Sequence, residues 1–203
     1  MNAILRSFAG PIARAPRRIM NNASEWRKRR HCQVDMSTVL LPTARIENHL
    51  GDASAISVGK RCRIGGELLV FAHGGKISIG NDCFVGEGSR IWSACSVSIG
   101  SRVLISHGVN IHDTNSHPLS AIGRHKQIIE IFNQGHPAAL SDVSEGSVVI
   151  EDDAWIGFNA AILKGVHVGK GAVIGAATVV LSDVPAYAIV VGNPARCVGE
   201  ALP

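Results

Sequence analysis

The chain has 203 residues, a formal net charge of +4, 46% hydrophobic but only 4% aromatic residues, and 22 glycines. This length and hydrophobic content predict one folded domain and exclude a disordered chain. A core with so few rings must consist of closely packed aliphatic side chains, and no stretch approaches the ~20 apolar residues that cross a membrane.

Residues 1–36 are predicted to form a basic, partly helical arm. Residues 1–30 hold eight Lys and Arg against a single acid, Glu25, so the rest of the chain is slightly acidic. We favour a solvated extension over a contact with an anionic membrane surface, and we expect no nucleic-acid partner. The arm lacks the apolar run of a signal peptide, and five cysteines without a Cys-x-x-Cys pair fit a reducing compartment. We expect a cytoplasmic protein, with the inner face of the membrane as the alternative location.

An aliphatic residue recurs every six positions in residues 37–198, which we assign to one domain followed by a tail at 199–203. The clearest run is Ile150, Ile156, Ile162, Val168, Ile174 and Val180. The same period appears within residues 79–111 and, more weakly, within 58–70. A period of six fits neither an α-helix nor simple β alternation; it fits a three-sided coil of short parallel strands with stacked inward aliphatic residues. In that coil Cys83 and Cys95 take inward positions, where a thiol is inert.

The period is interrupted by residues 112–147, which begin with the sequence HDTNSHP. A long excursion from a regular solenoid costs loop entropy and is usually functional. We expect a short helix over Gln127–Gln134, ended by Gly135. The segment is polar and basic, and it includes Arg124.

Two later segments accompany His117-Pro118: the sequence AWIG at 154–157 and GNPAR at 192–196. With the hexads, they resemble the hexapeptide-repeat acyltransferases, in the sugar and polysaccharide O-acetyltransferase branch (galactoside and maltose acetyltransferase-like), over roughly residues 50–198. The resemblance implies an all-β fold, a left-handed parallel β-helix with an inserted loop. It implies transfer of an acetyl group from acetyl-CoA to a hydroxyl of a surface polysaccharide or glycan precursor. It also implies a homotrimer with active sites between subunits, and no metal.

A hydroxyl that attacks a thioester needs a base, and the resemblance assigns this role to His117 because Pro118 follows it. Asp113 is a second catalytic candidate, since it can orient an imidazole, although it can equally end a coil. Glu87 lies near the position where some relatives place an acceptor-binding Asn. The candidates for acceptor binding are His112, Asn115, Glu87 and Arg124.

Acetyl-CoA should lie along the later coils, according to the same resemblance. Trp155 resembles the tryptophan at the thiol end of the slot, and Arg196 the arginine near the nucleotide end. Leu181-Ser182 replaces the Thr-Lys of many relatives, which removes one expected phosphate contact. The candidates for cofactor binding are Trp155, Gly157, Ala160, Ala176, Ala177, Ser182 and Arg196.

Three alternatives remain open on the sequence alone. The acceptor can be an amino group of a sugar instead of a hydroxyl. A zinc lyase of the γ-carbonic anhydrase type shares the solenoid, and His107, His112 and His117 lie five residues apart, near its ligand spacing. A non-catalytic solenoid used for assembly is the third alternative.

Overall fold

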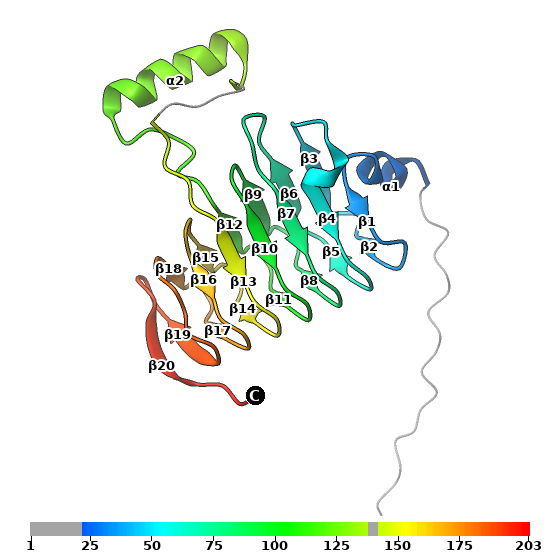
Figure 1. The fold of residues 1–203 in the computed structure, drawn as a ribbon, viewed down its shortest axis with the longest axis vertical. Helices are drawn as coiled ribbons and strands as arrows, with labels where there is room; N and C mark the ends of the chain where they lie inside the picture. Colours follow the sequence, from blue (N-terminus) through cyan, green and yellow to red (C-terminus); the bar gives the residue numbers. More distant parts are fainter. Residues whose placement is uncertain (1–21, 138–141) are drawn as a thin grey trace, which may run out of the picture.

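The computed structural model describes residues 22–137 and 142–203, so the predicted arm is seen only from residue 22 on. The hexads form short strands that stack into three sheets, which we name A, B and C (Figure 1). Sheet A contains β1(Gln33–Val34), β4(Ile56–Val58), β7(Ile77–Ile79), β10(Val97–Ile99), β13(Val148–Ile150) and β16(His167–Val168). Sheet B contains β2(Val39–Leu40), β5(Arg63–Ile64), β8(Phe84–Val85), β11(Leu104–Ile105), β14(Trp155–Ile156), β17(Val173–Ile174), β19(Ala188–Val191) and β20(Arg196–Glu200). Sheet C contains β3(Arg45–Asn48), β6(Glu67–Val70), β9(Arg90–Ser93), β12(Asn110–His112), β15(Ala161–Ile162) and β18(Val179–Val180).

Each coil gives one strand to sheet A, one to B and one to C, and it pairs in parallel with the next coil. The six-residue period sets this register: Ile150 pairs with Val168, and Ile156 with Ile174. The predicted inward positions from Ile150 to Val180 are all 0–1% exposed. Each fully buried Val or Ile contributes about 1.5–3 kcal/mol, so the stacked column stabilises the fold. The predicted left-handed parallel β-helix is confirmed.

The N-terminal end of the coil differs from the predicted boundary at residue 37, because β1 already belongs to the first coil. Helix α1(Asn22–Arg29) covers this end. Its Lys28 donates to the carbonyl oxygens of Leu41 and Pro42, both at 3.2 Å, and Arg29 donates to that of Thr38 at 2.8 Å. These bonds satisfy carbonyl groups of the first coil. A short 3₁₀ turn, η1(Ala53–Ala55), leads into the second coil.

One inward assignment was wrong. Cys83 is buried as expected, but Cys95 is exposed, because the chain turns out of β9 at Ala94 and the thiol lies on the outside of the corner. At the other end, β20 runs antiparallel to β19 and therefore includes the first residues of the predicted tail.

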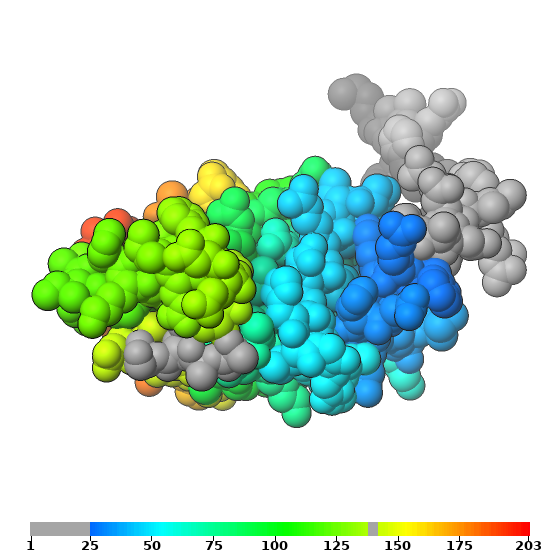
Figure 2. All heavy atoms as spheres, turned by 90° about the horizontal axis from the view of Figure 1, so that it is seen from above, coloured from blue at the N-terminus to red at the C-terminus, as the bar shows by residue number. Residues whose placement is uncertain are grey.

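Helix α2(Ala121–Gln134) projects away from the coils (Figure 1), and in the space-filling view from above its atoms lie at one end of the molecule, against those of the coils (Figure 2). It ends as predicted, at Gly135, whose φ of 85° favours glycine. It begins six residues earlier than predicted, because the Ser120 side chain caps it by accepting from the Gly123 backbone N–H. Among the described residues, no helix has the length and apolar character needed to cross a membrane.

Candidate active site

The inserted loop leaves the coil directly after β12, and Asp113 fixes its first turn. The carboxylate is fully buried and accepts from the Ser93 hydroxyl at 2.6 Å and from the backbone N–H groups of Ala94 at 2.7 Å and Cys95 at 3.0 Å. It does not bond to His117. The predicted role of Asp113 in orienting the imidazole is therefore not seen; this carboxylate instead joins the start of the loop to the preceding coil.

His117 is exposed on the loop, while Pro118 behind it is buried. Its Nδ1 lies 2.7 Å from Oε1 of Gln127, a buried residue of α2. The amide nitrogen of Gln127 also donates to the Ser116 carbonyl oxygen at 3.3 Å. In the part of the chain that the structure describes, nothing bonds to Nε2 of His117. An exposed imidazole held through one nitrogen, with the other available, suits a general base.

His112 points outward from the end of β12 and stacks on Trp92, with ring centroids 4.8 Å apart. Burial lowers the pKa of His112, the positive charge of Arg90 lowers it further, and Asp113 acts in the opposite direction. This ring is therefore neutral near pH 7. Nε2 of His112 and Nε1 of Trp92 are both buried, with no hydrogen-bond partner among the described residues. Binding of an acceptor by His112 stays a prediction.

Asn115 and Arg124 mainly support the loop. The backbone N–H of Asn115 donates to the Ser144 carbonyl oxygen at 3.0 Å and so ties the two strands of the loop together. The Arg124 guanidinium donates to the carbonyl oxygens of Pro118 at 3.2 Å and Leu119 at 2.6 Å. These bonds hold the backbone beside His117, and they leave contact of either side chain with an acceptor as a prediction.

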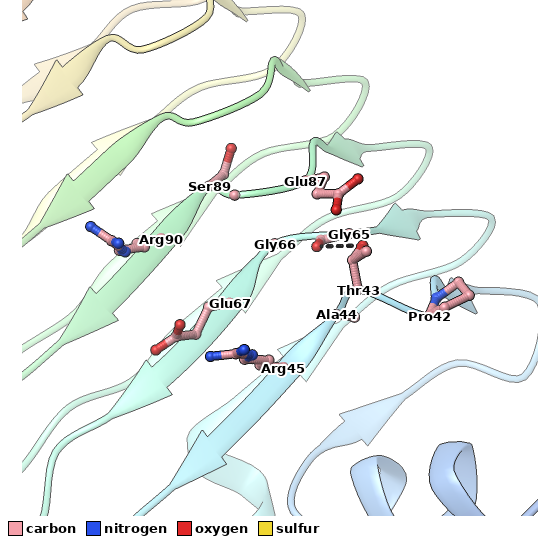
Figure 3. Close-up of a pocket in the computed structure, with 11 residues that line it drawn as sticks. Pro42, Thr43, Ala44, Arg45, Gly65, Gly66, Glu67, Glu87, Ser89 and Arg90 are labelled. Carbon is pink, nitrogen blue, oxygen red and sulfur yellow. Dashed lines mark hydrogen bonds between the residues drawn. The ribbon is translucent and has the colours of Figure 1, made fainter.

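Glu87 lines a notch at the corner between sheets B and C (Figure 3). The corner of the second coil has only two residues, Gly65 and Gly66, whereas its neighbours have four, at 41–44 and 86–89. The shorter corner leaves a cavity of about 410 Å³ between them. A Cβ on Gly66 would lie 2.6 Å from the Ser89 carbonyl oxygen, so glycine is required there.

The rim of the notch is charged. Arg45, Glu67 and Arg90 lie side by side in register at the starts of β3, β6 and β9 (Figure 3). None of these three, nor Glu87, forms an ion pair within the described residues. Glu87 lies before the start of β9, whereas His117 lies after the end of β12. Both strands belong to sheet C and run parallel, so the two residues lie at opposite ends of its strands. One chain alone does not bring them together.

The candidate cofactor residues fall into two groups. Trp155 is 49% exposed on the outside of sheet B, and its Nε1 donates to the Ser106 hydroxyl at 3.3 Å. The corners that follow β14 and β17 lie against each other next to Trp155, since a Cβ on Gly157 would lie 2.7 Å from the Ala176 backbone nitrogen. Ala176 and Ala177 are exposed there. Small side chains beside an exposed tryptophan leave room for a narrow pantetheine arm.

The remaining candidates lie elsewhere. Ala160 is 0% exposed and faces the inside of the coil, so its predicted contact with the cofactor was wrong. Its place in the hexad, four residues after Ile156, already indicated an inward side chain. Ser182 is exposed in the corner after β18, and Arg196 is exposed at the start of β20. Their contacts with a nucleotide stay predictions.

The three histidines weighed as zinc ligands do not converge. His107 is exposed at a corner, where its ring meets Phe84 edge to face, His112 stacks on Trp92, and His117 bonds to Gln127. Over residues 22–137 and 142–203 no group of three His, Cys, Asp or Glu side chains is placed to hold a metal ion.

Comparisons with known proteins agree with this fold. Residues 147–182 match the family described as "Bacterial transferase hexapeptide (six repeats)", and residues 76–112 match "Hexapeptide repeat of succinyl-transferase". A 2,3,4,5-tetrahydropyridine-2,6-dicarboxylate N-acetyltransferase of Staphylococcus aureus is 49% identical over 71 residues, which are 33% of this chain and 30% of that protein. The match thus spans less than a third of this curated relative.

Three solved structures share the fold. AntD, an N-acyltransferase from Bacillus cereus in complex with dTDP and 3-hydroxybutyryl-CoA, has 19% identity and a TM-score of 0.65 over 87% of each chain. The polySia-specific acetyltransferase NeuO has 24% identity and a TM-score of 0.63 over 83% of this chain and 66% of its own. A hexapeptide-repeat-containing acetyltransferase from Vibrio cholerae has 22% identity and a TM-score of 0.59 over 90% of this chain and 82% of its own. The chain thus carries hexapeptide repeats at residues 76–112 and 147–182, and it shares the three-sided coil of these acyltransferase structures.

Proposed function

We propose that the protein is an acetyl-CoA-dependent acetyltransferase that modifies a sugar and uses His117 as its general base. The observation that carries this proposal is the exposed His117 ring, held through Nδ1 by a buried neutral amide on the loop that interrupts the hexads. A solenoid used only for assembly has no need of an imidazole fixed in this way.

The proposed reaction needs one proton to move in step with one acyl transfer. The acceptor oxygen or nitrogen attacks the thioester carbonyl carbon, and Nε2 of His117 accepts the proton that the acceptor loses. The carbon–sulfur bond breaks, and the imidazolium of His117 returns the proton to the departing thiolate, which leaves as free CoA. An imidazole suits both steps because its unperturbed pKa of ~6.5 lies close to neutral pH.

The acceptor is proposed as a hydroxyl of a surface polysaccharide or glycan precursor. The alternative acceptor is an amino group. Two similar proteins support it, because the Staphylococcus aureus protein is described as an N-acetyltransferase and AntD as an N-acyltransferase. NeuO, described as specific for polySia, is the corresponding precedent for a polymeric sugar. Binding of acetyl-CoA is supported by the exposed Trp155 beside the small residues Ala176 and Ala177.

The homotrimer is also a proposal, and the exposed apolar side of α2 supports it. Ile122 is 71% and Phe132 75% exposed, on a helix that stands away from its own coils (Figure 1). A second copy would cover these side chains and could bring its own corner residues near His117. For the basic arm we keep a solvated extension as the favoured interpretation, with contact to an anionic membrane from the cytoplasmic side as the alternative.

The test is a panel of acceptors with acetyl-CoA, followed by detection of the released thiol. The panel contains a sialic acid oligomer as the hydroxyl acceptor and dTDP-4-amino-4,6-dideoxyglucose as the amine acceptor. His117→Ala should lower kcat by about 10²–10⁴-fold. The control is His125→Ala, an exposed histidine of α2, which should keep full activity. Equal activity in both variants would contradict the proposed base.

A further inference from the structure

Gln127 is the one residue of α2 that is buried, although its side chain is polar. A buried amide without hydrogen bonds would destabilise the fold by about 1–3 kcal/mol, so its partners matter. Both polar atoms of the Gln127 amide have a hydrogen-bond partner. Nε2 donates to the Ser116 carbonyl oxygen at 3.3 Å, and Oε1 lies 2.7 Å from Nδ1 of His117.

The Ser116 carbonyl decides which way the amide points. A carbonyl oxygen can only accept a hydrogen bond, so the Gln127 atom that faces it must be the NH₂ group. The opposite orientation would place two oxygen atoms 3.3 Å apart without a proton between them. Oε1 of Gln127 therefore faces His117, and because this oxygen is also only an acceptor, Nδ1 of His117 must carry the proton.

The backbone holds this arrangement from both sides. Ser116 has a φ of 62°, in the left-handed region that costs a non-glycine residue about 1 kcal/mol, and its N–H bonds to the Thr114 hydroxyl at 3.1 Å. The first turn of α2 sits on Pro118: a Cβ on Gly123 would lie only 3.0 Å from the proline ring. Arg124 bonds to the loop carbonyls on the same side. These contacts join the helix that carries Gln127 to the turn that carries His117.

We propose that Gln127 is a positioning residue that keeps His117 in the Nδ1–H tautomer, which leaves the Nε2 lone pair available as the base. This inference rests on the proposed function of His117. A free neutral imidazole favours the other tautomer, Nε2–H, which cannot accept a proton at Nε2. A neutral amide also fixes the tautomer without the added negative charge of a carboxylate, which would raise the pKa of the base.

The primary test is the tautomer itself, measured by ¹H–¹⁵N NMR on the full chain labelled with ¹⁵N-histidine, with the signals of residue 117 assigned from His117→Ala. The wild type should show a protonated Nδ1 and an unprotonated Nε2. Gln127→Leu should convert the ring mainly to Nε2–H. The matched control is Gln134→Leu, the same change at an exposed position at the end of α2, which should leave the ring unchanged.

Kinetics give the second readout, with the same sialic acid oligomer and dTDP-4-amino-4,6-dideoxyglucose. Gln127→Leu should lower kcat by about ten- to a hundredfold, within the range of a general base, and leave the KM for acetyl-CoA unchanged. Gln127→Glu keeps an acceptor beside Nδ1, so it should retain the Nδ1–H tautomer and shift the acidic limb of the pH–rate profile upward by about one unit.

A wild-type ring in the Nε2–H form, or a tautomer that Gln127→Leu does not change, overturns the proposal. Thiol release that survives in His117→Ala is a different result: it refutes His117 as the base. The tautomer measurement does not depend on turnover, so the two failures can be told apart.

Discussion

The carboxylate of Asp113 lies 2.6 Å from the hydroxyl of Ser93, and both residues are 0% exposed. Asp113 ends the fourth coil and Ser93 ends β9 in the third, so this contact joins two coils at the point where the inserted loop begins. The same carboxylate accepts from two backbone N–H groups. All three partners donate, which an ionised carboxylate matches and an amide does not.

Asp113→Asn is expected to lower the free energy of unfolding by about 2–4 kcal/mol, because one NH₂ group would face buried donors. Urea denaturation followed by circular dichroism measures the change. Ser93→Ala is the comparison; it removes the hydroxyl that bonds to Asp113 and to the Lys76 backbone, keeps both backbone N–H donors on the carboxylate, and should cost about 1–2 kcal/mol. An Asp113→Asn protein no less stable than Ser93→Ala would mean that this carboxylate does not hold the coils together.

The sequence was enough to predict the coils, because each inward residue is repeated six positions later and its neighbours are set by the same period. The loop was different. The partners of Asp113 lie 18–20 positions earlier, in the previous coil, and no local pattern connects them. Gln127 fell within the predicted helix, but its contact with His117 depends on how α2 docks on the loop. The start of α2 was missed because the cap at Ser120 was not recognised, although serine is a common cap.

His112 should make stability depend on pH. Its pKa is lowered in the folded protein, so between that value and ~6.5 the unfolded chain binds more protons than the folded one. Stability then rises with pH in this window and is lost as the pH falls through it. The slope is at most about 1.4 kcal/mol per pH unit for each proton. Thermal unfolding between about pH 5.5 and 7 measures it, above most of the range in which carboxyl groups titrate.

His112→Phe tests this assignment because it keeps a ring on Trp92 and removes the titrating group. The variant should show a flatter dependence of Tm on pH. The partly buried His73, whose pKa is also lowered, chiefly by burial, is expected to account for the part that remains. An unchanged slope in His112→Phe would show that His112 is not the group responsible.

The five cysteines should differ in their reactivity toward an alkylating reagent. Cys95 and Cys197 are exposed, whereas Cys32, Cys62 and Cys83 are buried, and burial raises the pKa of the Cys32 thiol to about 11. Iodoacetamide near neutral pH should therefore add two groups to the native chain and five in denaturant, as counted by mass spectrometry. Rapid labelling of Cys83 in the native protein would contradict its inward position, and protection of Cys95 would point to a covering subunit.

Ala160 and Ala176, which were both predicted to contact the cofactor, should respond differently to substitution by leucine. Ala160 is buried in the coil, so Ala160→Leu should overpack the core and lower stability by about 1–3 kcal/mol. Ala176 is exposed on the corner beside Gly157, so Ala176→Leu should leave stability unchanged. If the pantetheine arm passes this corner, Ala176→Leu should raise the KM for acetyl-CoA about tenfold, equivalent to about 1.4 kcal/mol of binding. Calorimetry with CoA gives the affinity independently of turnover, and an unchanged affinity in Ala176→Leu would place the cofactor elsewhere on the coil.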